Sequence, residues 1–358
     1  MRILKTFCLS AMLLLSCLGG AQQKRKVIID QDAAGPGGTD QQSMLLLIQS
    51  PQTEVLGITV VTGDQWLNEE VAHTLRMLEL IGRTDIPVVP GAEYPLVRQK
   101  EETERWEREF GVVPWVGAWT PKYYHPADEL GAMPEGKPTT QPSSEDAAHF
   151  LLRMVRQYPH QVTIYEGGPM TNLALAISID PGFAALAKEL VFMGGSFNPN
   201  TDNPEFRNTP MREFNLWFDP EAARIVLRAP WEKIVCTPVD ISVKTRLTED
   251  LIRQIKVGNS PAARYVGQYA RLRGNYNYLW DELAAAAWLD PGIITKKETL
   301  FLDIDLDRGA GYGNTLSWTE ANQPKAEMRP VEVQDDLDLE KFYRMFVALL
   351  SGPTPGKN

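Results

Sequence analysis

Residues 26–42 read KVIIDQDAAGPGGTDQQ, and this stretch decides the fold. Residues 26–30 form a short apolar run of the kind found in strands that are buried on both faces. The run leads directly into an acidic, glycine-rich turn that carries Asp30, Asp32 and Asp40. A strand that ends in clustered carboxylates predicts an α/β protein whose ligand site lies beyond the strand ends.

The following segments continue this alternation of short apolar strands and helices. The predicted strands are 26–30, 53–61, 86–89 and 162–166, and the predicted helices are 42–49, 68–81 and 144–156, the last with Ser144 as its N-cap. Strands separated by helices of this length imply a mostly parallel sheet with helices on both faces. Residues 97–143 interrupt the alternation, because they are rich in Trp, Pro and charge, and we expect them to form a long surface excursion near the ligand site.

Composition excludes several classes of protein. The chain has 358 residues, which suits one large α/β domain or two smaller ones, and we find neither a repeat nor a linker. A net charge of −10 argues against a nucleic-acid partner. No internal stretch approaches 18 apolar residues, so we expect no membrane span. The predicted fold class is therefore α/β, a single-domain, open, mostly parallel sheet flanked by helices, over residues 22–358.

Residues 1–21 are typical of a signal peptide. Arg2 and Lys5 precede an apolar run that ends in small residues at 19–21. A lipoprotein signal is a second interpretation, in which Cys17 would be lipidated and would anchor the protein. Either interpretation predicts an exported protein, periplasmic or extracellular. Without residues 1–21 only Cys236 remains, so no internal disulfide can form.

The acidic turn itself has more than one chemical interpretation. Three carboxylates on one tight turn repel one another unless a cation or protons neutralise them, and all-oxygen ligands favour Ca²⁺ or Mg²⁺ over Zn²⁺. Asp30-x-Asp32 after a strand also resembles the nucleophile and acid of haloacid-dehalogenase-type phosphatases, but Ala33-Ala34 follows where those carry Thr or Val. A phosphate-binding loop would need Gly-Lys-Ser/Thr, which does not follow residues 35–38.

Later motifs favour one interpretation. In order along the chain they are residues 30–42, 167–174 (GGPMTNLA), 190–195 (LVFMGG), 212–223 (REFNLWFDPEAA) and 280–291 (WDELAAAAWLDP). Together they resemble the signatures of the inosine-uridine-preferring nucleoside hydrolase family across nearly the whole mature length. The resemblance implies calcium-dependent hydrolysis of the N-glycosidic bond of ribonucleosides, which gives ribose and free base.

The resemblance also implies a role for each matching residue. One Ca²⁺ would be held by Asp32, Asp40, Asp281 and the backbone carbonyl of Gly167. Asp32 would also be the general base on a water molecule, and Asp30 would support the site from behind. Glu213 and Asn215 would hold ribose hydroxyls. The family pattern also implies that an Asn from residues 198–208 makes a further sugar contact, and we assign this role to Asn208. Family members often form oligomers, so the resemblance also implies a homo-oligomer with a small-molecule riboside as its ligand.

The sequence departs from the family pattern at positions that bear on the substrate. Asp32 and Asp40 are eight positions apart where the family has five, and Thr39 replaces one of two adjacent aspartates. Asp64 stands where the family has Asn, and Trp280 replaces a His that helps to protonate the leaving base. Trp280 could stack on a base or a sugar, or simply pack. These changes keep an alternative open, a hydrolase or binding protein of the same fold that acts on a different riboside or sugar.

His125 is a candidate for the missing acid. It lies in a segment that matches in length a mobile His-containing loop of the family, and a surface histidine is the alternative interpretation. Tyr276 and Tyr278 could contact a base or pack at the rim. Trp106, Trp115 and Trp119 could line a lid over the site, but ordinary packing is the favoured interpretation.

Overall fold

The computed structural model describes residues 24–209 and 211–356. The predicted signal peptide, residues 1–21 with Cys17, lies outside the described residues. The strands are β1 (Arg25–Gln31), β2 (Thr53–Val60), β3 (Val88–Pro90), β4 (Val162–Glu166), β5 (Glu189–Met193), β6 (Ile234–Thr237), β7 (Ile294–Ile304), β8 (Thr315–Trp318) and β9 (Pro330–Leu337). The helices are α1 (Thr39–Gln49), α2 (Leu67–Ile81), α3 (Lys100–Phe110), α4 (Ala147–Gln157), α5 (Thr171–Ile179), α6 (Phe183–Leu186), α7 (Pro204–Asn208), α8 (Phe214–Phe218), α9 (Pro220–Arg228), α10 (Val239–Ser242), α11 (Glu249–Val257), α12 (Pro261–Tyr269), α13 (Trp280–Leu289) and α14 (Leu339–Ser351), with short 3-10 turns at Gly117–Trp119 and Pro291–Ile293.

The described strands form one sheet in the order β3-β2-β1-β4-β5-β6-β9-β7-β8. The pairs from β3 to β9 are parallel, whereas β7 runs antiparallel to both β9 and β8. The mostly parallel α/β sheet expected from the sequence is therefore confirmed. No helix among the described residues is both long and apolar enough to cross a bilayer.

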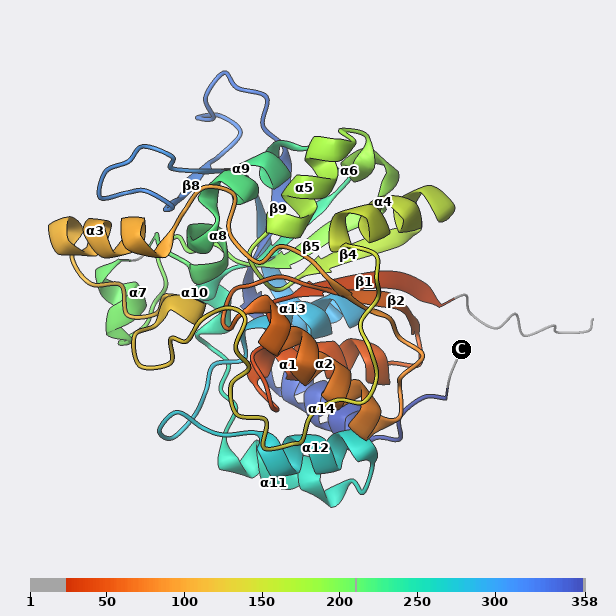
Figure 1. The fold of residues 1–358 in the computed structure, drawn as a ribbon. Coiled ribbons are helices and arrows are strands. Elements are labelled where there is room, and N and C mark those ends of the chain that lie inside the picture. The colour runs from red at the N-terminus through yellow and green to blue at the C-terminus, as the bar shows by residue number, and fades with distance from the viewer. Residues whose placement is uncertain (1–23, 210, 357–358) are drawn as a thin grey trace, which may run out of the picture.

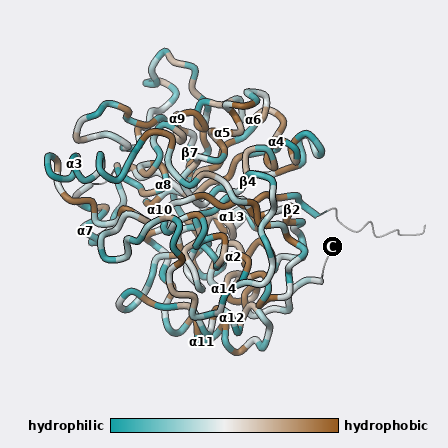
Figure 2. Tube along the Cα trace, in the orientation of Figure 1, coloured by the Kyte–Doolittle hydropathy of each residue, from teal (hydrophilic) through white to brown (hydrophobic). Residues whose placement is uncertain are grey.

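Helices cover both faces of the sheet. Val27 and Ile29 of β1 pack into one apolar cluster, and Ile28 between them packs into the other, as the two-residue period of a strand requires. Figure 1 shows α4, α5 and α9 above the sheet and α1, α2 and α14 below it. In Figure 2 the hydrophobic segments lie at the centre and the hydrophilic ones on the outer loops. Burial on both faces explains why the strands are continuous apolar runs.

One local prediction is corrected. α4 begins after Asp146, whose carboxylate accepts a hydrogen bond from the backbone N–H of His149 at 3.1 Å, so Asp146 and not Ser144 is the N-cap. The excursion at 97–143 contains the helix α3. Only Thr103 and Trp106 of α3 are buried, so the helix has too few apolar positions to be recognised by periodicity.

Candidate active site

The carboxyl ends of the parallel strands bring the sequence-predicted residues to one edge of the sheet. Asp32 follows β1, Asp64 follows β2, and Gly167 follows β4. Asp281 lies in the first turn of α13, and its backbone carbonyl accepts a 2.7 Å hydrogen bond from the hydroxyl of Tyr165 in β4. The strand ends and the start of one helix thus supply the predicted acids, as expected for an open parallel sheet.

Asp32, Asp40 and Asp281 are three buried carboxyl groups with mutual electrostatic influence. Each is at most 7% exposed, and the carboxyl groups of Asp40 and Asp281 face each other within hydrogen-bonding range. Burial raises the pKa of all three, and the pKa of Asp32 is raised further by neighbouring carboxylates, Asp64 first among them. Among the described residues, no Lys or Arg forms an ion pair with any of the three.

The backbone approaches Asp32 closely on one side. A Cβ atom at Gly63 would lie 2.0 Å from Oδ2 of Asp32, so only glycine fits there. The backbone N–H of Asp64 donates a 3.0 Å hydrogen bond to the same oxygen. The loop after β2 therefore orients the carboxylate proposed as the base.

Asp30 is buried at the end of β1, two residues before Asp32. Its Oδ1 accepts a 2.8 Å hydrogen bond from Nδ2 of Asn172, and its carboxyl group also contacts that of Glu166. Burial raises the pKa of Asp30 to about 6, although the bond from Asn172 acts in the opposite direction. The fully buried Glu166 was not selected from the sequence, although its position at the end of a strand, just before Gly167, was the available signal.

Glu213 and Asn215 lie at the start of α8. The carboxylate of Glu213 caps the helix, because it accepts hydrogen bonds from the backbone N–H groups of Asn215 at 2.8 Å and Leu216 at 3.1 Å. Nδ2 of Asn215 donates to the carbonyl oxygens of Gly167 at 3.0 Å and Met193 at 3.2 Å. The proposed sugar ligands and the proposed backbone metal ligand are therefore in direct contact.

Asp64 is joined to the excursion. Its Oδ1 accepts a 2.6 Å hydrogen bond from the indole N–H of Trp115, and the guanidinium of Arg273 lies 4.8 Å from the Trp115 ring. Burial and the charge of Asp40 raise the pKa of Asp64 to about 7, and the bond from Trp115 opposes this rise. Trp115 thus connects the excursion to the loop that holds Asp32, whereas Trp106 and Trp119 are buried in one apolar cluster.

Trp280 is half-buried at the first position of α13. Its ring lies 4.7 Å from that of Tyr278 and 5.4 Å from that of Phe206. The residue precedes Asp281 in the chain, and the described contacts of its ring are with these two aromatic rings. Tyr278 also contacts Tyr276, with 5.3 Å between the ring centroids.

The structure describes the side chain of His125 but not that of Asn208, the two remaining residues predicted to bind the substrate. Nε2 of His125 lies 3.1 Å from Oε2 of Glu69 in α2, so the imidazole is engaged with that helix in this conformation. Asn208 ends α7, but its side chain lies outside the described part of the structure.

The residues at this edge have donor chemistry that suits a hard divalent cation. The described chain holds no group of three or more His, Cys, Asp and Glu side chains already drawn together around a metal position. Nevertheless, Asp32, Asp40 and Asp281 are buried carboxyl groups that form no ion pair with a described residue, and Oδ1 of Asp281 has no hydrogen-bond partner among the described residues. Buried charges of this kind require protons, cations or both, and oxygen donors favour Ca²⁺ or Mg²⁺.

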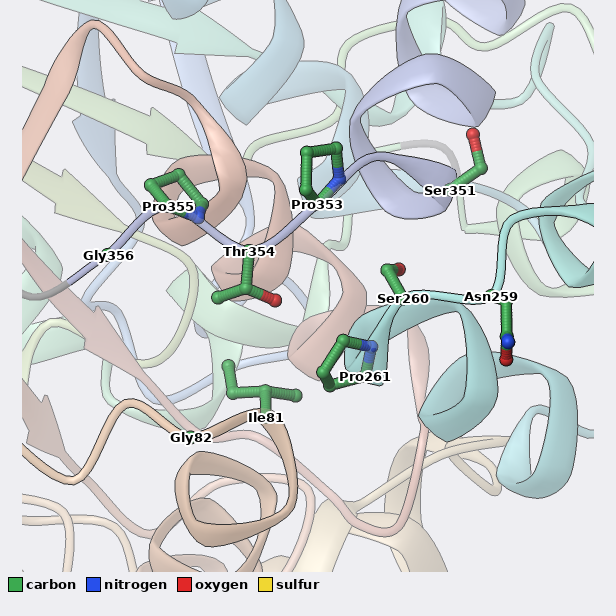
Figure 3. A pocket seen from close by; sticks show the side chains of 10 residues that line it. All are labelled: Ile81, Gly82, Asn259, Ser260, Pro261, Ser351, Pro353, Thr354, Pro355 and Gly356. Atoms are coloured by element: carbon green, nitrogen blue, oxygen red, sulfur yellow. The ribbon is translucent and has the colours of Figure 1, made fainter.

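A separate hollow lies far from these residues. It has a volume of about 700 Å³ and is shown in Figure 3. Its lining consists of Ile81, Gly82, Asn259–Pro261, Ser351 and Pro353–Gly356. Ile81 ends α2, whereas the acidic edge faces the start of that helix, so the helix length separates the two places.

Comparison with known proteins agrees with this geometry. Residues 27–344 match the family model described as inosine-uridine preferring nucleoside hydrolase. The chain is 29% identical to uridine nucleosidase 1 of Arabidopsis thaliana, with 94% of this chain and 98% of the relative covered. It is 27% identical to the inosine-uridine preferring nucleoside hydrolase of Leishmania major, with 91% and 97% covered.

Solved structures agree as well. A structure described as an inosine-guanosine nucleoside hydrolase has a TM-score of 0.74 at 22% identity and covers 91% of this chain, with 98% of that chain covered, so it shares the fold. The family model spans most of the sequence, and its motifs meet at one edge of the sheet. The chain therefore belongs to the inosine-uridine preferring nucleoside hydrolase family, whose members hydrolyse ribonucleosides to ribose and free base.

Proposed function

We propose that this chain hydrolyses the N-glycosidic bond of ribonucleosides with the help of one Ca²⁺ ion. Asp32, Asp40, Asp281 and the carbonyl oxygen of Gly167 would hold the ion. The observation that carries the proposal is the meeting of three buried carboxyl groups that form no ion pair with any described residue. When bound, Ca²⁺ would acidify a water molecule and orient the sugar hydroxyls.

The side chains have separate tasks in this reaction. Asp32 accepts the proton of the water whose oxygen forms a bond to the anomeric carbon. The bond between that carbon and the base nitrogen breaks, and its electron pair leaves with the base. The transition state resembles an oxocarbenium ion, so the carboxylates beside it stabilise its positive charge. Glu213 and Asn215 hold ribose hydroxyls and keep the sugar in line.

The leaving base would lie against the aromatic side of the pocket. Trp280 stands where a histidine would supply a proton, and loss of a general acid typically costs about 10²–10⁴ in rate unless another group replaces it. The proximity of Trp280 to Asp281 supports stacking on the base as its role. His125 would need to leave Glu69 to take part.

The alternative from the sequence, a different riboside or sugar as the ligand, is favoured by one observation. Asp64, which replaces an Asn of the family pattern, is occupied by the hydrogen bond from Trp115. This contact alters the wall of the pocket next to Asp32. A substrate panel therefore needs ribosides with purine, pyrimidine and other leaving groups.

Release of ribose from that panel tests the proposal. The mature chain is assayed with Ca²⁺ and with EDTA, beside Asp32→Ala, Asp281→Ala and the exposed matched control Asp250→Ala. We expect turnover that EDTA and the two site variants abolish and that Asp250→Ala retains. No ribose from any riboside in the presence of Ca²⁺ would refute hydrolysis, and turnover unchanged by EDTA would refute the metal.

We also propose that the protein is exported and forms a homo-oligomer. Export is supported by the charged, apolar and small-residue pattern of residues 1–21. The homo-oligomer is supported by the oligomers that members of the family often form. Mass spectrometry of the protein from the periplasm would locate the cleavage site and reveal lipid on Cys17. Light scattering of the purified protein would give its mass in solution, and a monomer would contradict the second expectation.

A further inference from the structure

Two arginines and two aromatic rings alternate in a single stack beside α8. The guanidinium carbon of Arg308 lies 4.4 Å from the ring centroid of Tyr312. The guanidinium carbon of Arg98 lies 4.2 Å from Tyr312 and 4.2 Å from Trp217. The order is therefore Arg308, Tyr312, Arg98, Trp217, with each cation on the face of a ring, an arrangement that attracts most strongly where water is excluded.

The inner half of the stack is buried. Arg98 is 2% exposed and Trp217 is fully buried. Nε and Nη2 of Arg98 form no hydrogen bond with any residue in the described ranges. Burial lowers the pKa of Arg98 to about 10, so it remains charged at neutral pH. The two rings, together with the nearby carboxylates of Glu221 and Glu102, therefore stabilise a charge that has no hydrogen bonds on these atoms.

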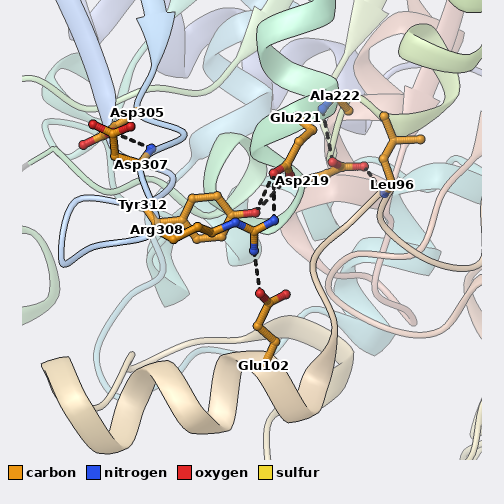
Figure 4. Close-up of polar contacts among 9 residues, drawn as sticks. All are labelled: Leu96, Glu102, Asp219, Glu221, Ala222, Asp305, Asp307, Arg308 and Tyr312. Carbon is orange, nitrogen blue, oxygen red and sulfur yellow. Dashed lines mark hydrogen bonds and ion pairs between the residues drawn. The ribbon is translucent and has the colours of Figure 1, made fainter.

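The outer half joins three segments that are distant in sequence. Figure 4 shows Arg308 between Glu102 of α3 and Glu221 of α9, at 2.5 Å and 3.5 Å. The hydroxyl of Tyr312 donates to Glu221 at 2.8 Å. The hairpin between β7 and β8 therefore fastens the helix of the excursion to the body of the protein.

The inner end of the stack reaches the proposed sugar ligands. Trp217 lies two residues after Asn215 on the five-residue helix α8, which Glu213 caps. Gly313 approaches both Trp217 and Arg98, because a Cβ atom there would lie 2.7 Å from Cδ1 of the indole and 3.0 Å from Nη2 of Arg98. Close packing against Arg98 and the hairpin leaves the Trp217 ring little freedom, and the same holds for the short helix that carries it.

We propose that Arg98 is a positioning residue that sets the orientation of α8 and, through it, the contacts of Asn215 and Glu213 with ribose. The inference rests on the proposed function, because it assumes that these two side chains hold sugar hydroxyls. None of the three carboxylate metal ligands lies on α8, and α8 touches the proposed metal site only through the hydrogen bond from Asn215 to the carbonyl oxygen of Gly167. A change at Arg98 is therefore expected to alter sugar recognition more strongly than metal binding.

The chemistry of the side chain explains why arginine is needed. A guanidinium is flat and can lie between two rings, whereas the ammonium of lysine is a compact, strongly hydrated charge. Methionine keeps much of the length but removes the charge. Both Arg98→Lys and Arg98→Met are thus expected to loosen the stack, for different reasons.

The test compares the two variants with the unmodified protein on a ribonucleoside and on its 2′-, 3′- and 5′-deoxy analogues. We expect KM for the ribonucleoside to rise about tenfold, since small displacements of positioning groups have effects of this size or larger. The preference for the ribonucleoside over at least one deoxy analogue should fall by a similar factor. The Ca²⁺ dissociation constant, measured by calorimetry, should change by a smaller factor than KM, because only the carbonyl of Gly167 among the proposed metal ligands contacts α8.

Arg153→Met is the matched control, since Arg153 stacks on Phe150 at 5.2 Å on the outside of α4. Tyr312→Leu opens the stack from the other side and replaces the Arg98 variants if they do not fold. Folded variants with unchanged KM and unchanged preference for all three analogues would overturn the inference, and so would an equal loss in Arg153→Met.

Failure of the proposed function gives a different pattern. If the unmodified protein binds the ribonucleoside without releasing ribose, hydrolysis is refuted, and Arg98 is judged by the dissociation constants of the same ligands. If the unmodified protein neither binds nor cleaves any riboside, both proposals are refuted.

Discussion

The indole N–H of Trp115 donates a 2.6 Å hydrogen bond to Oδ1 of Asp64, which joins the excursion to the loop behind Asp32. Asp64 is half-buried between these two segments. A buried acceptor that loses its partner costs about 1–3 kcal/mol. The bond therefore favours the conformation in which the excursion covers the site.

Trp115→Phe should raise KM for ribonucleosides about tenfold, because the ring remains and only the donor is lost. Steady-state kinetics with the best substrate of the panel measures the change. Trp231→Phe is the control, since its indole N–H bonds to the carbonyl of Val226 within the apolar core. Kinetics identical to those of the unmodified protein would show that the bond does not hold the lid.

Asn172→Ala should weaken Ca²⁺ binding by less than the roughly 10–100-fold that follows loss of a direct partner of a metal ligand, because Asn172 holds Asp30, which supports the site and does not bind the ion. The side-chain amide of Asn172 donates a hydrogen bond to Asp30, which precedes Asp32 by two residues. Oδ1 of Asn172 accepts a 2.8 Å hydrogen bond from the backbone N–H of Ala92. Calorimetric titration with Ca²⁺ measures the effect. Asn68→Ala provides an amide control on α2, and an unchanged dissociation constant in Asn172→Ala would contradict the supporting role of Asp30.

The sequence predicts the part of the site that follows from strand ends. Each apolar run stops at a polar or glycine residue, and parallel strands place their carboxyl ends at the same edge of the sheet. The sequence alone therefore predicts that Asp32, Asp64 and Gly167 lie close together. Asp281 required the family motif, because nothing local to α13 indicates which strand end it faces. The sheet order, with β1 between β2 and β4, likewise depends on contacts across the chain.

The rest depends on contacts between distant residues that have no local signal. Arg98 looks like a surface arginine in the sequence, and only its place between Trp217 and Tyr312 makes it buried. Asp146 is preceded by Ser144, which is an equally good cap on propensity alone. The choice between them follows from where the backbone turns into α4.

Glu135→Ala should destabilise the fold by about 3–5 kcal/mol, because it leaves His73 buried beside a cavity and without its partner. The two side chains contact each other and are almost completely buried, and the His73 ring packs against Gly35 in the loop between Asp32 and Asp40. Urea denaturation gives the free energy of unfolding. The exposed pair of His149 and Asp146 offers a comparison, since His149→Ala should cost less than about 1 kcal/mol. Equal losses in the two variants would contradict the expectation.

The free energy of unfolding of the Asp219→Asn variant should increase relative to that of the unmodified protein as the pH rises. Asp219 is fully buried, and burial raises its pKa from 3.8 to about 6, although Thr171 and the backbone of Leu96 donate hydrogen bonds to it. A folded-state pKa above the unfolded value means that the folded protein holds the proton more tightly. The stability that this group contributes is then fully present below about pH 4 and is lost as the pH rises through 6.

Asparagine does not titrate, so its contribution stays constant over the same range. Between pH 4 and pH 8 the free energy of unfolding of the unmodified protein should fall relative to that of Asp219→Asn by about 3 kcal/mol, from a shift of about two pKa units. Urea denaturation of both proteins at several pH values, with Ca²⁺ held constant, measures the difference. A difference that does not change with pH, or that changes in the opposite direction, would mean that hydrogen bonds from Thr171 and Leu96 outweigh burial and keep Asp219 ionised.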